Sequence, residues 1–235
     1  MAVTLTASTP FQSTASVTTA TVTLPTGLAD GDYTLLCCAL NASSGFINPP
    51  AGWDEVLTST NSDAASGSTS LAHAIYVRKW QSGDSDPVVT CKSGRFAVLP
   101  VRVEGADSTT FLETVAAVTK TTTKTTDIIA PSVDSVDSPL LCYTLTARHA
   151  SGGHFITFLP AAGDTELGEA GSADSTTTNA SVSLNTSVIT PGAASGTRTG
   201  TASETTTGAM AASFIIKAAP TAPPEVAFSG WGIPI

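Results

Sequence analysis

Few residues in this chain have the types and spacing that catalysis requires. His149 and His154 flank the short segment 151–153, a spacing that suits a metal pair but offers no third ligand. His73 lies in an alternating segment without a pattern of catalytic partners, so a packed or surface histidine is the favoured interpretation. The sequence contains no phosphate loop, no Gly-x-Ser-x-Gly elbow and no His-Glu-x-x-His motif. We therefore expect no enzymatic activity, no cofactor and no metal site.

Acidic residues allow two further hypotheses. Two pairs of carboxylates stand close enough in the sequence for glycoside hydrolysis, and four turn aspartates could bind calcium together with backbone oxygens. They are Asp54 with Glu55, Glu166 with Glu169, and Asp30, Asp32, Asp84 and Asp86. Any β-sandwich produces such carboxylate pairs by strand spacing, and aspartate is a common turn residue. Structural roles are the preferred interpretation of all of them.

Aromatic residues suggest binding rather than catalysis. Trp53 and Trp80 are candidates for stacking on a glycan, and Tyr76 lies between them in the sequence. The alternative is that these rings fill a core, a use that β-sandwiches make of them equally well.

The elements that position these residues are organised around the apolar stretch Tyr33–Leu40. It is eight residues long and turn-forming residues bound it on both sides, so we expect a strand buried on both faces. A related stretch returns as Ser138–Leu145, in which Leu141-Cys142 matches Leu36-Cys37 at an offset of 105 residues. This match predicts that the second half of the chain replays the first.

The cysteines fit the same picture. Adjacent Cys37 and Cys38 should point to opposite faces of their strand. Together with Cys91 and Cys142 they form no C-x-x-C pair, so we expect four buried free thiols rather than a zinc site. Cys37 and Cys142 occupy equivalent places in the two halves and would approach each other if the halves pack by a pseudo-twofold axis.

Short strands separated by Gly, Pro or Asp turns predict an all-β fold, an antiparallel β-sandwich. We expect one sandwich domain over 1–218, with pseudo-repeats at about 20–106 and 127–218; two tandem sandwiches are the alternative. The first repeat should close with two strands, 88–92 and 96–104. Pro100 in the second of these suggests a bulge or an edge position.

Composition limits the partners. The chain has 41% hydrophobic and 12% charged residues, and 19 acidic residues outnumber 10 basic ones, which argues against disorder and against a nucleic-acid partner. No signal peptide and no run of ~20 apolar residues is visible, so we expect a protein made in a cytoplasm and without a membrane partner.

The last residues, 219–235, form a Pro-rich spacer and an apolar terminus that we interpret as an assembly arm. The residues expected to dock on another surface are Phe228, Trp231, Ile233 and Ile235.

One pattern in the first half resembles a known family. It reads Gly-Leu-Ala-Asp-Gly-Asp, an apolar strand, Pro-Pro-Ala-Gly-Trp, a strand ending in Val-Arg-Lys-Trp, and Gly-Asp. It resembles virion proteins of tailed bacteriophages of actinobacteria, called minor tail or appendage proteins. The resemblance covers about residues 20–218, although no tryptophan follows Gly163 in the second copy. It implies a jelly-roll or lectin-like β-sandwich with a duplicated half, and it supplies no catalytic residues.

The function that the resemblance implies is structural. We expect a virion protein, located in the tail or tail tip, that contacts other virion proteins and forms a homo-oligomer. A capsid decoration protein is one alternative. A carbohydrate-binding module that attaches to a host-surface glycan is another, and a glycoside hydrolase is a more distant one.

Overall fold

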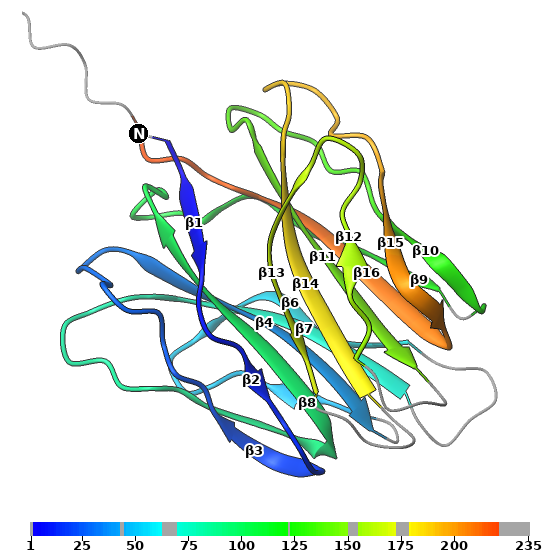
Figure 1. The fold of residues 1–235 in the computed structure, drawn as a ribbon. Coiled ribbons are helices and arrows are strands. Elements are labelled where there is room, and N and C mark those ends of the chain that lie inside the picture. Colours follow the sequence, from blue (N-terminus) through cyan, green and yellow to red (C-terminus); the bar gives the residue numbers. More distant parts are fainter. Residues whose placement is uncertain are drawn as a thin grey trace, which may run out of the picture.

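The fold consists entirely of β-strands in the part of the chain that can be described. The computed structural model describes residues 2–42, 45–62, 70–121, 123–149, 155–172 and 179–220, with the backbone alone at 62 and 149. Within these ranges there are sixteen strands and no α-helix, and neighbouring strands pair antiparallel throughout (Figure 1). The predicted all-β, antiparallel architecture is thus confirmed.

The first half builds one large sheet. Five strands run in the order β1–β8–β4–β7–β6, and β2, β3 and β5 also pair with β8. The strands are β1 (Thr4–Ala7), β2 (Phe11–Gln12), β3 (Val17–Thr21), β4 (Tyr33–Ala42), β5 (Ile47–Asn48), β6 (Asp54–Ser62), β7 (Ser70–Lys79) and β8 (Val88–Glu104).

The second half builds two sheets. A five-stranded sheet runs in the order β13–β14–β11–β16–β9, and a three-stranded sheet in the order β10–β15–β12. The strands are β9 (Leu112–Thr121), β10 (Thr125–Ala130), β11 (Leu140–His149), β12 (Phe158–Leu159), β13 (Thr165–Gly171), β14 (Asn179–Val188), β15 (Arg198–Thr206) and β16 (Gly208–Ile216).

Three hydrophobic cores separate the layers. The central core lies between the β1–β8–β4–β7–β6 part of the first sheet and the five-stranded second sheet. It contains side chains of β4, β7 and β8 from one half and of β11, β14 and β16 from the other. A second core lies between the outer face of the first sheet and β3 and β5. A third lies between the second sheet and the β10–β15–β12 sheet. The molecule is therefore layered, and its middle core is shared by both halves.

Strand β4 is buried along its whole length, as the sequence predicted. Its alternation sends Cys37 into the central core and Cys38 into the core beneath β3 and β5. All four cysteines are buried and free, which confirms the prediction for them. Cys142 shares the central core with Cys37. Burial raises the pKa of the Cys37 thiol to about 12, so it stays protonated.

Strand β8 corrects one prediction. The segments 88–92 and 96–104 are not two strands but parts of one 17-residue strand. Its first part, Val88–Gly94, pairs with β3 and β5, and from Arg95 onward it pairs with β4. The single strand therefore belongs to two layers.

Pro100 occupies neither a bulge nor an edge strand. It pairs with Leu36 in an unshifted register on the β4 side. On the other side its carbonyl accepts a hydrogen bond from Ser8 N (2.9 Å), just where the neighbouring strand breaks between β1 and β2. Because the N–H and C=O of one residue in an antiparallel strand point the same way, the donor that proline lacks faces this break.

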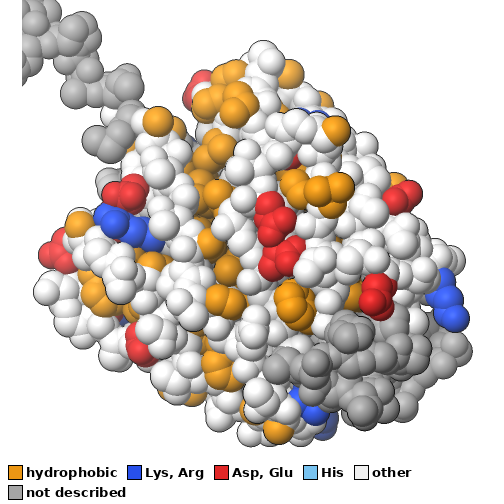
Figure 2. Space-filling view, viewed as in Figure 1, with side chains coloured by type: hydrophobic (Ala, Val, Ile, Leu, Met, Phe, Trp, Pro, Cys, Tyr) orange, Lys and Arg blue, Asp and Glu red, His pale blue; other side chains and the backbone are white. Residues whose placement is uncertain are grey.

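The two halves meet along a seam of apolar side chains. Strand β1 lies beside β13, and β6 lies beside β9. A Cβ on Gly168 of β13 would lie 3.0 Å from the Cβ of Ala7, so glycine permits this close approach. Figure 2 shows hydrophobic side chains in a band between the halves on this face; partly buried Val3, Leu5, Ala7 and Leu167 pack against the central core here.

Candidate functional site

The two candidate glycan-stacking residues lie at one corner of the first half. Trp53 directly precedes β6 and Trp80 directly follows β7, and both line one narrow space. A larger groove of about 360 Å³ adjoins it. That groove is lined by Pro50, Ala51, Trp53, Arg78, Gly83, Asp84, Ser85, Asp86, Pro87 and Val88. The structure thus brings together two side chains that are 27 residues apart in the sequence.

The Trp53 ring is poorly placed for stacking. It is 9% exposed and packs in the core beneath β3 and β5, whereas Trp80 is half-buried at the margin of that core. Stacking needs an open ring face, so only Trp80 offers one in part.

The polar groups of this corner are already paired. The guanidinium of Arg78 binds both carboxylate oxygens of Asp84, and its Nη1 also donates to the Ala51 carbonyl at 3.3 Å. Asp86 accepts the Leu24 N–H at 3.0 Å. Gly52 has a φ of +77°, and a Cβ there would lie 2.8 Å from Arg78 Nη1. The polar side chains that could bind a sugar here therefore already bind each other or the backbone.

The turn aspartates have structural roles. Asp32 accepts Arg102 Nε at 2.8 Å and the Ala29 N–H at 2.9 Å, and Asp30 accepts the Ser82 N–H at 2.7 Å. Within the described ranges no group of three or more His, Cys, Asp or Glu residues could hold a metal ion.

One of the two carboxylate pairs is brought to a common face. A bulge between Glu166 and Gly168 in β13 disturbs the alternation, so that Glu166 and Glu169 influence each other electrostatically. Burial, followed by the charge of Glu166, raises the pKa of the Glu169 carboxyl to about 7, although the Phe158 N–H donates to it. A glycosidase acid also has a raised pKa, but neither glutamate lines any cavity described here. The other candidate, Glu55, accepts the Thr58 hydroxyl at 2.8 Å.

His73 is not exposed. It is fully buried in β7, facing the central core, and its Nε2 lies 3.1 Å from Thr144 Oγ1 of the other half. Burial lowers the pKa of the His73 imidazole to about 3, so it stays neutral. The side chain of His149 and all of His154 lie outside the described residues.

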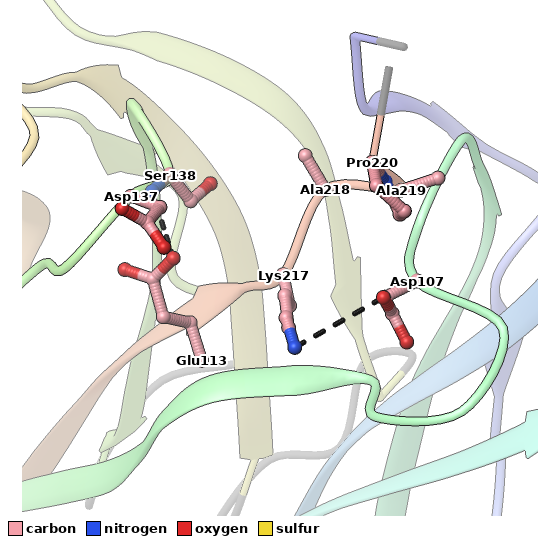
Figure 3. A pocket seen from close by; sticks show the side chains of 8 residues that line it. All are labelled: Asp107, Glu113, Asp137, Ser138, Lys217, Ala218, Ala219 and Pro220. Carbon is pink, nitrogen blue, oxygen red and sulfur yellow. Dashed lines mark hydrogen bonds and ion pairs between the residues drawn. The ribbon is translucent and has the colours of Figure 1, made fainter. Parts of the chain in front are cut away.

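A second polar cavity of about 410 Å³ lies where the chain leaves β16 (Figure 3). Glu113 on β9 accepts the N–H groups of Val136 (2.6 Å) and Ser138 (2.7 Å). Asp107 accepts the N–H groups of Thr109 and Thr110, and Lys217 lies 4.0 Å from it. The hydrogen bond from the Thr109 hydroxyl (2.7 Å), followed by those from the Thr109 and Thr110 N–H groups, keeps the pKa of Asp107 low, at about 2. These carboxylates brace loops at the root of the arm.

Beside that cavity lies an apolar groove of about 250 Å³. We name it the terminal groove; it is lined by Ala2, Val3, Ser138, Pro139, Leu140, Val188 and Ala218. Its residues come from the segment before β1, the segment before β11 and the first residue of β11, the end of β14 and the segment after β16. The sequence did not point to this groove, because its residues are scattered and none belongs to a motif.

The arm residues Phe228, Trp231, Ile233 and Ile235 lie outside the described residues, which end at Pro220. No helix in the described part of the chain is long and apolar enough to cross a membrane. Neither a protein-family model, nor a curated protein, nor a solved structure matches this chain.

Proposed function

We propose that this protein is a structural component of a bacteriophage virion, a minor tail or tail-tip protein held by protein–protein contacts. The observation that carries the proposal is the terminal groove: an open apolar surface at the root of a Pro-rich arm with an apolar end. Contiguous apolar surface that remains exposed on a folded protein marks interaction sites. The resemblance of the Pro-Pro-Ala-Gly-Trp region to phage tail proteins agrees with an assembly role.

The proposal extends to the architecture, as a jelly-roll or lectin-like sandwich that arose by duplication. Each five-stranded sheet has the same order, if β1, β8, β4, β7 and β6 are matched with β9, β16, β11, β14 and β13. The outer strands β3 and β5 match β10 and β12 in the same way, with β15 in place of the first part of β8. The proximity of β1 to β13 and of β6 to β9 across the seam supports a pseudo-twofold axis.

The proposal includes the absence of enzymatic activity. Glu169, the most buried carboxyl among the hydrolase candidates, accepts a hydrogen bond from the Phe158 N–H. It does not line any of the cavities described above. Purified protein should release no sugar from host cell-wall glycans. Release that is lost on changing Glu55 or Glu166 would contradict this.

Fractionated phage particles test the location. Tails and capsids are separated on a gradient and probed with an antibody to this chain, with the tail-tube and major capsid proteins as fraction controls. We expect the chain in the tail fraction. Its presence in capsids alone would support a decoration protein, and its absence from washed particles would overturn the proposal.

A second candidate function, binding of a host-surface glycan, is favoured by one observation: Trp53 and Trp80 meet at one corner. Trp80→Ala should leave the fold intact and abolish any binding to host glycans in a titration. Equal binding by this variant would exclude the corner as a glycan site.

A further inference from the structure

The terminal groove has one highly exposed apolar side chain at its rim and two that pack against the central core. Val188 at its rim is 84% exposed, the largest value among the large hydrophobic side chains described. Val3 and Leu140 below it pack against the central core. The wall is held by the bond from Ile189 N to the Pro139 carbonyl (2.8 Å) and by the two N–H groups that Glu113 accepts. The groove is thus preformed, which lowers the entropy cost of binding.

The apolar end of the arm has a pattern that suits such a groove. Trp231, Ile233 and Ile235 alternate with Gly232 and Pro234. In an extended segment, alternate residues share one face, so three large apolar side chains would point the same way. The lining of the groove is apolar apart from Ser138.

The arm of the same chain is poorly suited to fill its own groove. Ala218 is part of the groove wall, so the arm starts at the groove and must return to it. Pro220, Pro223 and Pro224 predict an extended spacer, ~3.1 Å per residue. The next three residues, 225–227, include no Gly, Asn or Asp to turn the chain. A reversal at Gly230 would leave five residues, roughly 16 Å of chain, to retrace roughly 30 Å.

We propose that the terminal groove receives the arm of a second copy of this chain, with Trp231, Ile233 and Ile235 in contact with Val188 and Leu140. Each copy offers one arm and one groove, so two copies can exchange arms reciprocally or a row of copies can link head to tail. This inference rests on the proposed assembly function and names the partner at that surface.

Two full-length variants separate the arm from the groove. Trp231→Ser with Ile233→Ser disables the arm, and Val188→Asp disables the groove at an exposed position where folding is not at risk. Val115→Asp is the matched control, because Val115 is 74% exposed on β9 but does not line the groove. Mass is measured by light scattering over a hundredfold range of concentration.

We expect the native chain and Val115→Asp to associate, and the arm and groove variants to stay monomeric. A mixture of the two defective variants should associate again, since one has an intact groove and the other an intact arm. A labelled peptide of residues 221–235 should bind the arm variant and lose at least tenfold in affinity when Val188→Asp is added.

Three results would overturn the inference. The first is a native chain that is monomeric and does not bind the peptide although the arm variant binds it, because each arm would then fill its own groove. The second is a peptide that binds neither the native chain nor the arm variant, because the groove would then belong to another partner. The third is association that survives in both the arm variant and the groove variant, because the contact between copies would then lie elsewhere. A monomeric chain that is still found in phage tails would refute this inference alone, whereas an associating chain that is absent from particles would refute the proposed function alone.

Discussion

Replacing His73 by leucine would test how the two halves are held together. His73 is a fully buried titratable group that faces the shared core, and its one hydrogen bond within the described residues crosses from β7 to Thr144 on β11. Its Nδ1 has no partner in that part of the chain. If the halves are matched by their strand order, Leu184 of β14 occupies the corresponding place in the second half. The fold therefore already accommodates leucine in this environment.

The magnitude follows from proton linkage. Burial lowers the pKa of His73 to about 3 in the folded protein, whereas histidine in an unfolded chain titrates at about 6.5. Between these values the unfolded chain binds a proton that the folded chain does not, so the free energy of unfolding falls as the pH falls. Each pH unit corresponds to ~1.4 kcal/mol, so His73 should cost about 3 kcal/mol of stability between pH 7 and pH 4.

Urea unfolding at pH 7, 5.5 and 4 measures this cost. His73→Leu should be within about 1.5 kcal/mol of the native protein at pH 7, because a buried polar nitrogen is removed while Thr144 loses a partner. Between pH 7 and pH 4 the free energy of unfolding of His73→Leu should rise by about 3 kcal/mol relative to that of the native protein. Thr144→Val, which removes the hydrogen bond and keeps the imidazole, should retain the native pH dependence. If His73→Leu loses stability toward acid as steeply as the native protein, the reasoning is wrong.

Three further predictions concern other sites. The raised pKa of Glu169, about 7, means that the ionised carboxylate destabilises the folded protein. Between pH 5 and pH 8 the free energy of unfolding of Glu169→Gln should therefore rise by about 1–2 kcal/mol relative to that of the native protein, as measured in urea. An unchanged pH profile would contradict the burial of this carboxyl. Gly94→Ala would place a Cβ 2.4 Å from the Asn41 carbonyl, so we expect a loss of about 1–3 kcal/mol in the free energy of unfolding, while the exposed neighbour variant Ser93→Ala stays neutral; equal stability of both would show that β8 can shift. Glu113→Ala should cost about 2 kcal/mol, seen as a lower melting temperature, because two backbone N–H groups lose their acceptor.

The fully buried strand of the first half could be predicted from the sequence because burial leaves a strong pattern. An eight-residue apolar run between turns has few solutions other than a central strand, and β4 is one. The continuity of β8 could not be inferred in this way. Residues 92–95 are polar or glycine and look like a turn, yet they lie where the strand passes from one layer to the next and pairing continues on both sides.

The surfaces were harder to predict than the core. Trp53 and Trp80 were recognisable by residue type, but only the structure shows that Trp53 is packed and that Arg78 and Asp84 bind each other. The partner of His73 lies on β11, 71 residues away, and those of Glu113 lie in the segment before β11, so sequence spacing does not reveal them. The terminal groove consists of common apolar residues, and only their convergence at the chain ends makes it a site.

The crossing between layers differs between the two halves. In the first half, β8 passes from the outer layer to the central sheet near Gly94, where the Asn41 backbone leaves no room for a side chain. In the second half the same path is divided into β15 and β16, with Thr207 between them and Gly208 at the start of β16. A glycine stands at or next to the crossing in both cases, and at Gly94 the close approach of the Asn41 carbonyl requires it. The break frees the β10–β15–β12 sheet from the central sheet, whereas β3 and β5 remain bonded to it through β8. Both halves thus bury an apolar core between two layers, whereas the hydrogen-bonded connection between the layers is present in only one of them.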